Sequence, residues 1–481
     1  MTTKFLSIHG HFYQPLRRDP FTGRIGHEPW AEPYHDFNEK INAECYRPNA
    51  EAGNFRHMSF NLGPTLACWL EEKDPRTYET ILAADREHNL RYGCGSALAQ
   101  AYNHAILPLA SSREKRIQIA WGIADYQHRL GHAPEGFWLA ETAVDYASLN
   151  IMAAMGIRFT ILAPWQAATP VDPSEPYLVS LSGGRSITVF FFDASLSEAV
   201  SFNDEATVNA DVFSARLLAK QLNPQKLSRG EPQMLLVATD GETYGHHKCW
   251  RDKFLTHLFN VSAPRDGFEV ITLARYLHLH PPAREALVEE DSSWSCHHGL
   301  KRWRDSCDCI VGSGSWKWHL RHALTRLAAK VDAIYELQAG PNLRDPWSTV
   351  EDYVEVKLGR VSPRAFLSAH SSGAPVEACQ ALLRLLEAQY YRHVMFTSCA
   401  FFFEDLDRIE PRNNIAFAAR AIALIRSASG IDLEEAFVSD LSAARSWKTN
   451  RSGADIYREV KSQRRKRREE AGAATGSLTA A

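Results

Sequence analysis

Acidic and imidazole side chains follow three apolar runs of this sequence. Residues 5–8 lead into His9-Gly10-His11, residues 136–140 into Glu141, and residues 234–239 into Asp240-Gly241-Glu242. Continuous apolar runs are typical of strands in a parallel sheet, because helices cover both faces of that sheet. In a parallel β/α barrel the catalytic groups lie at the carboxyl ends of the strands. Glu141 and Asp240 are therefore candidates for catalytic acids.

Two carboxyl groups on either side of an anomeric carbon can cut a glycosidic bond. One protonates the leaving oxygen, and the other attacks the sugar or activates a water; the two lie about 5–5.5 Å apart in retaining enzymes and roughly 6.5–9.5 Å apart in inverting ones. Glu242 could raise the pKa of Asp240 through its negative charge, or hydrogen-bond a sugar hydroxyl. Structural roles stay open, because Glu141 could begin the following helix and Asp240 could form an Asp-Gly turn.

Strands and helices alternate in the first half of the chain. Helical periodicity is present at residues 77–89, 112–130 and 146–155. The alternation predicts parallel pairing, and the turn after the first strand lacks the glycine pair that approaches a pyrophosphate in open sheets, which favours a barrel. Residues 268–271 could add an eighth strand. The seven predicted strands lie near residues 5–8, 57–62, 90–93, 136–140, 158–162, 187–192 and 234–239.

The second half of the sequence predicts a different architecture. Amphipathic runs at residues 316–337, 377–403 and 413–426 indicate helices. We therefore predict a β/α barrel catalytic domain at residues 1–280, an α-helical domain at 281–445 and a charged, disordered tail at 446–481. The basic residues 464–468 could instead contact nucleic acid, but a solvated charged end is the interpretation we adopt.

Composition narrows the class of protein. The hydrophobic fraction is 45%, the charged fraction is 23% and the formal net charge is -3, so no global field attracts nucleic acid or a membrane surface. No run of about eighteen apolar residues predicts a membrane span. The nine cysteines are irregularly spaced, and the N-terminus shows no signal-peptide pattern. We expect a cytoplasmic protein with reduced thiols.

Other side chains could contact a sugar. Trp138 lies in the fourth predicted strand and Trp165 follows the fifth. Both could stack on a glucose face, although core packing is the alternative for Trp138. Asp193 ends the sixth predicted strand and could bind a hydroxyl group. His9 and His11 could each donate one hydrogen bond and accept another in their neutral forms.

The chain resembles glycoside hydrolase family 57, whose members act on α-glucans. The resemblance spans about residues 1–275 and rests on three motifs in order, which are His9-Gly10-His11-Phe12-Tyr13-Gln14-Pro15, Trp138-Leu139-Ala140-Glu141 and Thr239-Asp240-Gly241-Glu242-Thr243-Tyr244-Gly245-His246-His247. It implies an incomplete seven-stranded barrel followed by a helical domain, and retention of anomeric configuration. Glu141 would be the nucleophile and Asp240 the general acid/base. The predicted substrate-binding residues are His9, His11, Gln14, Trp138, Trp165, Asp193, Glu242 and His246.

Two departures from the family pattern concern the substrate and the second domain. The second motif of the family usually carries a glutamate, and the corresponding residues 92–96 and 102–104 contain none. Residues 293–296, 299–304, 307–309 and 395–399 resemble a subgroup whose barrel is followed by domain of unknown function 3536. These departures leave open the choice between water and sugar as acceptor, and between α-1,4 and α-1,6 bonds.

Two further hypotheses remain. His9, His11, Asp240, His246 and His247 resemble the ligands of hydrolytic zinc enzymes, which would make the protein a metal-dependent carbohydrate hydrolase. The altered second motif would also suit a non-catalytic glucan-binding protein. A second possible zinc cluster comprises Cys296, His297, His298, Cys307 and Cys309. Its Cys-x-Cys spacing is unusual for zinc, so reduced cysteines in a loop core are the interpretation we adopt. Our prediction is catalysis by the two carboxylates, with no metal and no cofactor.

Overall fold

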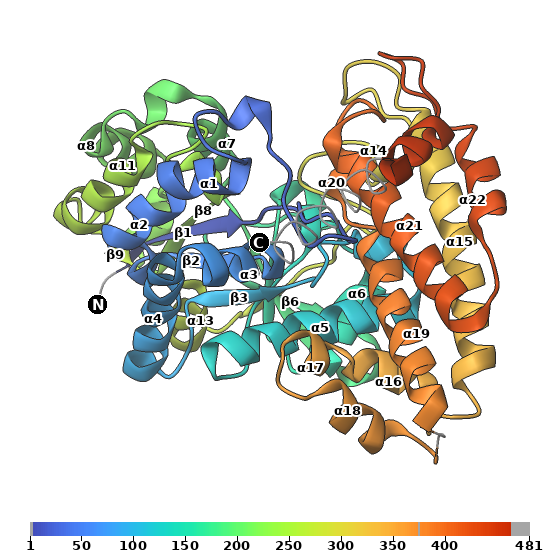
Figure 1. The fold of residues 1–481 in the computed structure, drawn as a ribbon. Helices are drawn as coiled ribbons and strands as arrows, with labels where there is room; N and C mark the ends of the chain where they lie inside the picture. The colour runs from blue at the N-terminus through green and yellow to red at the C-terminus, as the bar shows by residue number, and fades with distance from the viewer. Residues whose placement is uncertain (1–2, 374–375, 463–481) are drawn as a thin grey trace, which may run out of the picture. The chain divides into compact units, whose positions relative to one another are not determined.

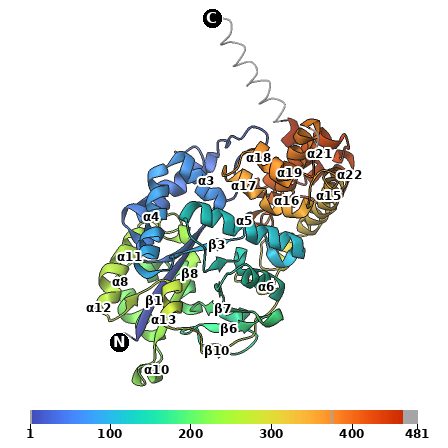
Figure 2. The same cartoon turned by 90° about the horizontal axis from the view of Figure 1, so that it is seen from below.

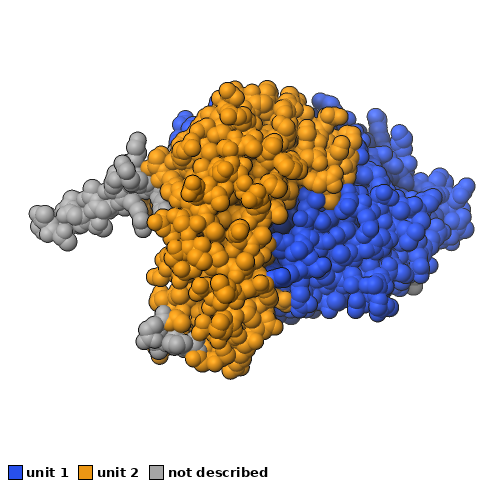
Figure 3. Space-filling model, turned by 90° about the vertical axis from the view of Figure 1, so that its right-hand side faces the viewer, with its two compact units in different colours: residues 1–14, 27–297 blue, residues 15–26, 298–481 orange. Residues whose placement is uncertain are grey.

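The structure is a computed structural model that describes residues 3–373 and 376–462. The chain forms two compact units, coloured separately in Figure 3. Unit 1 comprises residues 1–14 and 27–297, and unit 2 comprises residues 15–26 and 298–481. This division differs from the predicted boundary at residue 280, because residues 281–297 pack with unit 1. Asp291, for example, donates its backbone N–H to the carbonyl of Val144.

Parallel strands form the centre of unit 1. Five of them pair in the order β4-β3-β2-β1-β8, and β5 pairs with β7 in parallel. A bridge between Gly136 and Phe159 joins β4 to β5, and the N–H of Asp193, after β7, donates to the carbonyl of Leu236 in β8. The strands are β1 Lys4–Phe12, β2 Ser59–Leu62, β3 Ala97–Gln100, β4 Phe137–Trp138, β5 Phe159–Leu162, β6 Tyr177–Ser180, β7 Ser186–Phe191, β8 Gln233–Asp240, β9 Glu269–Val270 and β10 Arg284–Glu285.

This pairing yields an incomplete barrel of seven parallel strands within the described residues, in the order β8-β1-β2-β3-β4-β5-β7. The predicted fold class is confirmed. Residues 268–271 do not form an eighth barrel strand, because β9 contributes only two residues, which pair with the start of β1. Strand β6 is antiparallel to β7 and was not predicted.

One predicted strand is wrong. Residues 90–93 are the end of helix α4, which Asp74 caps and which Gly93 closes in a left-handed conformation at φ 72°. The strand of this region is β3, at Ala97–Gln100. Its sequence, Ala-Leu-Ala-Gln, has little intrinsic preference for a strand, and burial between β2 and β4 determines its conformation.

Helices surround the barrel strands in unit 1. Figure 1 shows α4 and α5 beside β2 and β3, and Figure 2 shows α5 next to β3. Ser111 and Glu114 form a capping box that starts α5. The helices of this unit are α1 Phe37–Ile41, α2 Arg47–Glu51, α3 Pro64–Lys73, α4 Pro75–Tyr92, α5 Ser112–Leu130, α6 Tyr146–Ala154, α7 Ala194–Phe202, α8 Ala210–Val212, α9 Ala219–Gln221, α10 Pro224–Ser228, α11 Arg251–His257, α12 Ala263–Arg265 and α13 Leu273–Leu279.

Unit 2 is helical, as predicted. Helices α15, α19, α21 and α22 pack along one another, and Leu324, Leu386 and Ile422 are buried between them. Arg392 forms an ion pair with Asp332 at 2.9 Å. The helices are α14 Lys301–Arg304, α15 Trp316–Ala339, α16 Pro346–Asp352, α17 Val354–Lys357, α18 Pro363–His370, α19 Val376–Val394, α20 Cys399–Phe402, α21 Ile409–Ser429 and α22 Glu434–Leu441.

The predicted tail begins too early. Residues 446–462 belong to unit 2 and residues 453–462 are helical. Ile456 and Tyr457 are buried, and Tyr457 contacts Phe437 edge-on. The high charge of this stretch led to the prediction of disorder, although Ile456 and Tyr457 pack in the core of unit 2. The rest of the predicted tail, including the basic residues 464–468, lies outside the described residues. Among the described helices, none is long and apolar enough to cross a membrane.

Candidate active site

The register of the sheet places the polar side chains in one row at the carboxyl edge. His11 of β1 lies opposite Asp240 of β8 and opposite Asn61 of β2. Gln100 of β3 lies opposite Trp138 of β4, three residues before Glu141. Parallel strands bring their carboxyl ends to the same edge, so residues far apart in sequence meet there. The two predicted catalytic carboxylates accordingly stand at one end of one barrel.

Glu141 lies in a tight backbone turn after β4. Its φ is 58°, and the next residue, Thr142, has a φ of 49°. Two successive non-glycine residues in the left-handed region are strained, and a β-branched residue is especially so. Such strain is stored at functional sites when surrounding contacts hold it. The backbone N–H of Trp294 donates to the carbonyl of Glu141 at 3.2 Å and supports this turn.

Two side chains orient the Glu141 carboxylate. The indole N–H of Trp294 donates to Oε2 at 3.0 Å, and the hydroxyl of Ser295 donates to the same oxygen at 2.9 Å. Trp294 also packs edge-on against Trp138, with ring centroids 5.1 Å apart. These contacts hold the carboxylate in one position, as an attacking group requires.

The Trp294→Phe variant tests this positioning. Loss of a hydrogen bond to a charged group is expected to lower kcat/KM by roughly 10-fold to 100-fold. Initial rates on a maltooligosaccharide measure the effect, and Trp30→Phe is the matched control, because Trp30 is 87% exposed. A variant with the kcat/KM of the wild type would show that the indole does not position Glu141.

The surroundings of Asp240 favour the protonated form that a general acid needs. The residue is accessible to solvent, yet the surrounding protein desolvates its carboxyl group and raises its pKa to about 8, with smaller contributions from the negative charges of Glu242 and Glu141. The charge interaction between Asp240 and Glu141 also indicates that the two carboxyl groups lie near each other. A carboxylic acid that keeps its proton at neutral pH can donate it to a leaving oxygen.

Glu242 is buried and held by several donors. Oε1 accepts hydrogen bonds from the hydroxyl of Tyr46 at 2.6 Å, the backbone N–H of Tyr13 at 3.3 Å and the amide of Gln14 at 3.5 Å. Burial raises the pKa of Glu242 to about 7 despite these bonds, which favour the ionised form. The negative charge of Glu242 contributes to the raised pKa of Asp240. The predicted roles of Glu242 and Gln14 in substrate binding stay predictions.

The pH dependence of activity follows from this arrangement. The pKa of Asp240 is raised, so its acid form persists through neutral pH and is lost as the pH rises through about 8. We expect kcat/KM to fall above that pH. The Glu242→Gln variant removes a negative charge that raises the pKa of Asp240, and should shift this alkaline limb to lower pH. A pH-rate profile measures the shift.

The control for this shift is Glu198→Gln, which removes an equal charge from an exposed position of α7. The alkaline limb of this variant should coincide with that of the wild type. An unchanged limb in Glu242→Gln would contradict the proposed coupling between Glu242 and Asp240.

The two motif histidines form a buried neutral network. His9 Nε2 lies 3.1 Å from Oδ1 of Asn61, and His11 Nδ1 lies 2.8 Å from Nδ2 of Asn61. Burial lowers the pKa of His9 to about 3 and that of His11 to about 4. His104, from the altered second motif, lies 3.1 Å from His11 between the two Nε2 atoms. This burial favours a role in holding the surroundings of the carboxylates.

Trp138 does not offer a face to a sugar in this structure. It is fully buried and stacks on His9 and His11, with ring centroids 4.8 and 5.1 Å apart. This burial favours the alternative of core packing, because the two histidines and Trp294 contact the indole. A contact of Trp138 with a sugar stays a prediction. Trp165, by contrast, is 44% exposed, and its indole N–H donates to the carbonyl of Ser293 at 3.1 Å.

Asp193 and His246 have partners within the protein. Asp193 caps α7 by accepting a hydrogen bond from the N–H of Leu196 at 2.8 Å, and burial raises its pKa. His246 Nδ1 lies 2.5 Å from Oε2 of Glu44. Any contact of these two side chains with a sugar would have to use their remaining polar atoms. Their predicted role in substrate binding stays a prediction.

The hypothesis of a catalytic metal has no geometric support in the described part of the chain. The candidate ligands His9, His11, Asp240, His246 and His247 are not among the described groups whose ligand atoms lie within 4.8 Å of one another. Asn61 engages both His9 and His11, as described above. We therefore derive the chemistry from the two carboxylates.

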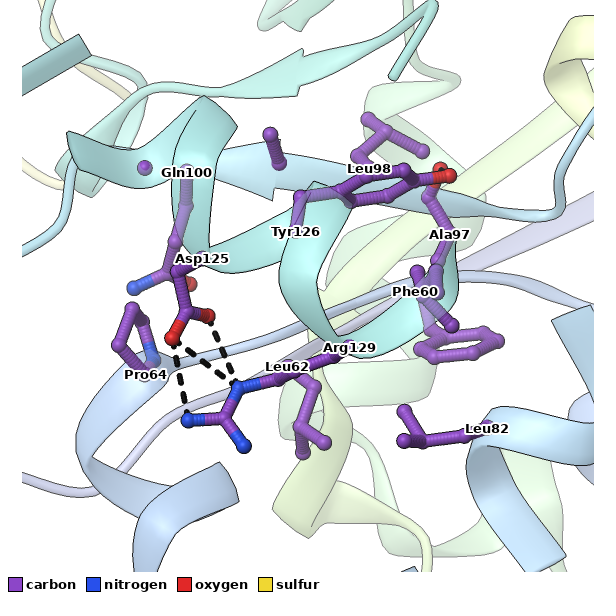
Figure 4. Close-up of a pocket in the computed structure, with 13 residues that line it drawn as sticks. Phe60, Leu62, Pro64, Leu82, Ala97, Leu98, Gln100, Asp125, Tyr126 and Arg129 are labelled. Carbon is purple, nitrogen blue, oxygen red and sulfur yellow. Dashed lines mark hydrogen bonds and ion pairs between the residues drawn. The ribbon is translucent and has the colours of Figure 1, made fainter. Parts of the chain in front are cut away.

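A separate pocket lies between the sheet and its covering helices (Figure 4). Its lining includes Phe60, Leu82 and Leu98, and the ion pair between Asp125 and Arg129 borders it. Neither Glu141 nor Asp240 lines this pocket. It is part of the packing between α4, α5 and the strands, and not the catalytic centre.

Sequence comparison identifies the family. The profile described as glycosyl hydrolase family 57 matches residues 6–288, which is more than half of the chain. The chain belongs to glycosyl hydrolase family 57. A second profile, a domain of unknown function (DUF3536), matches residues 313–476. Both parts of the resemblance in the sequence are thereby confirmed.

Curated family relatives are longer than this chain. An α-amylase of Pyrococcus abyssi is 20% identical over 284 residues, which are 57% of this chain and 38% of that protein. α-Amylase 1 of Dictyoglomus thermophilum is 21% identical over 211 residues, which are 42% of this chain and 28% of that protein. The chain thus spans less than two fifths of the length of these two relatives.

Solved structures of the family share the fold. An exo-type maltose-forming amylase from Pyrococcus sp. ST04 has a TM-score of 0.72 at 16% identity, covering 91% of this chain and 82% of that one. A GH57-type branching enzyme from Pyrococcus horikoshii has a TM-score of 0.59 at 15% identity, covering 96% and 94%. At these identities the likeness establishes the fold alone.

Several residues of the family 57 site were not predicted from the sequence. Trp294 and Ser295 were named only within residues 293–296, which resemble the subgroup with the second domain, yet both side chains contact Glu141. Tyr46 and Asn61, which engage Glu242 and the two histidines, lie outside the recognised motifs. The polar Asn61 within an apolar strand was the available signal, because a buried amide needs hydrogen-bond partners.

Proposed function

We propose that this protein is a retaining glycoside hydrolase or glucanotransferase that acts on α-glucans through a covalent glycosyl-enzyme intermediate. The observation that carries the proposal is the pairing of Glu141 with Asp240 at the carboxyl end of one barrel. Asp240 has a pKa raised to about 8, partly by the charge of Glu141. The named relatives are amylases and a branching enzyme, which supports an α-glucan substrate.

Each carboxylate has a distinct role in this mechanism. Glu141, oriented by Trp294 and Ser295, attacks the anomeric carbon while Asp240 protonates the departing oxygen. The bond from carbon to the leaving oxygen breaks, and an ester of Glu141 forms. Asp240, now ionised, then takes a proton from water or from a sugar hydroxyl, which displaces Glu141. Two displacements at one carbon retain its configuration.

Product analysis with maltoheptaose tests the proposal. Pure protein is incubated with the sugar, and the products are separated by chromatography. Shorter sugars alone indicate hydrolysis, longer linear sugars indicate transfer, and new branch points indicate branching. Unchanged maltoheptaose together with binding measured by calorimetry would favour a non-catalytic glucan-binding protein and would contradict the proposal.

We also propose a cytoplasmic location. The structure describes all nine cysteines, and none of them forms a disulfide. This supports a reducing compartment.

A further inference from the structure

Three cysteines and a histidine lie close together in the segment of residues 296–309, which includes the short helix α14. The ligand atoms of Cys296, His298, Cys307 and Cys309 all lie within 4.8 Å of one another. Nδ1 of His298 is 3.3 Å from Sγ of Cys307 and also 3.3 Å from Sγ of Cys309. We propose that these four side chains bind one zinc ion as a structural site, which departs from our prediction of no metal.

The distances suit a tetrahedral ion. Zinc binds sulfur at about 2.3 Å and nitrogen at about 2.0–2.1 Å, so neighbouring ligands of a tetrahedral site lie roughly 3.5–3.8 Å apart. The two distances from His298 to sulfur are close to this range. Nδ1 of an imidazole can donate or accept one hydrogen bond, yet it stands equally near two sulfurs. A cation between the side chains accounts for that arrangement.

The chemistry of the ligands selects the ion. Three thiolates and one imidazole prefer zinc among the common divalent cations, and four protein ligands leave no open position for substrate. The backbone N–H of Cys309 donates to Sγ of Cys307 at 3.4 Å and helps to fix the position of that sulfur. Arg302 donates to the carbonyl of Cys309 at 3.2 Å and holds the loop. These ligand types and contacts are those expected of a structural zinc site.

The position of the cluster indicates what the ion stabilises. The ligands flank the short helix α14, and residues 305–315 contain neither helix nor strand. A metal ion bound to these side chains would hold the loop in its folded conformation. The free energy of metal binding would add to the stability of the folded state. Cys296 directly follows Ser295, which orients Glu141. An effect of zinc on activity through Ser295 rests on the proposed function, but the binding of zinc does not.

Metal analysis of the purified protein tests the site. Protein produced in zinc-containing medium and purified without chelators should hold one zinc ion per chain. Elemental analysis by inductively coupled plasma mass spectrometry measures this content. Cys307→Ser and Cys309→Ser should each lose the bound zinc. Cys249→Ser is the matched control, because Cys249 is exposed and lies outside the cluster, and it should keep the metal.

A second measurement uses the wild-type protein, so that misfolding of a variant cannot decide the result. After removal of zinc by a chelator, cobalt(II) should restore binding with the visible bands of a tetrahedral site and a thiolate charge-transfer band. The Tm should fall on chelation and recover with added zinc. Folded wild-type protein that binds neither metal, zinc retained by both serine variants, or a disulfide involving Cys307 would each overturn the proposal.

Discussion

The Glu141→Gln variant is expected to lower kcat on maltoheptaose by at least about 10⁴-fold, as loss of a nucleophile does in other covalent mechanisms. Glutamine has nearly the same shape and its carbonyl oxygen can still accept from Trp294 and Ser295. Its uncharged amide, however, is too weak a nucleophile to form the glycosyl ester. Initial rates measured by chromatography of the products give the effect, and the thermal unfolding midpoint shows whether the fold is intact.

The matched control for Glu141→Gln is Glu79→Gln, an identical change on α4, where Glu79 forms an exposed ion pair with Arg86. Its kcat should equal that of the wild type. Turnover by folded Glu141→Gln within a few-fold of the wild type would refute the role of Glu141 as nucleophile, whatever the control shows.

The Asp240→Asn variant is expected to lose about 10²-fold to 10⁴-fold in kcat/KM on maltoheptaose, the usual contribution of a general acid. An amide cannot protonate the departing sugar oxygen. The loss should be much smaller on an aryl maltoside with an acidic phenol as leaving group, because this group departs without a proton. Comparison of the two substrates isolates proton donation from substrate binding.

The same variant tests retention of configuration. With the aryl maltoside, ester formation proceeds while the base for the second step is missing, so the ester should accumulate. Mass spectrometry should find the added sugar on the peptide that contains Glu141. The control is Asp204→Asn, at a residue that forms an ion pair with Lys248 across 3.4 Å. Equal losses on both substrates would argue against Asp240 as the acid.

The fold could be predicted where one physical signal dominated. The long apolar run of β8 and the helical periodicity of α5 both reflect burial, and both elements lie where expected. Strand β3 was misplaced because its residues carry weak intrinsic preferences, and contacts with β2 and β4 determine its path. Two buried side chains, Ile456 and Tyr457, similarly extend unit 2 into the charged stretch.

The family, the barrel class and the two candidate carboxylates could be read from the amino-acid sequence, because strand ends and short motifs are local features. The protonation and the orientation of these carboxylates depend on contacts that form only in the folded chain. The pKa of Asp240 depends on desolvation and on the charges of neighbouring Glu242 and of Glu141 from another strand end, and the orientation of Glu141 depends on Trp294, about 150 residues later. Electrostatic and hydrogen-bonding effects act through space, so they appear only once the chain has folded.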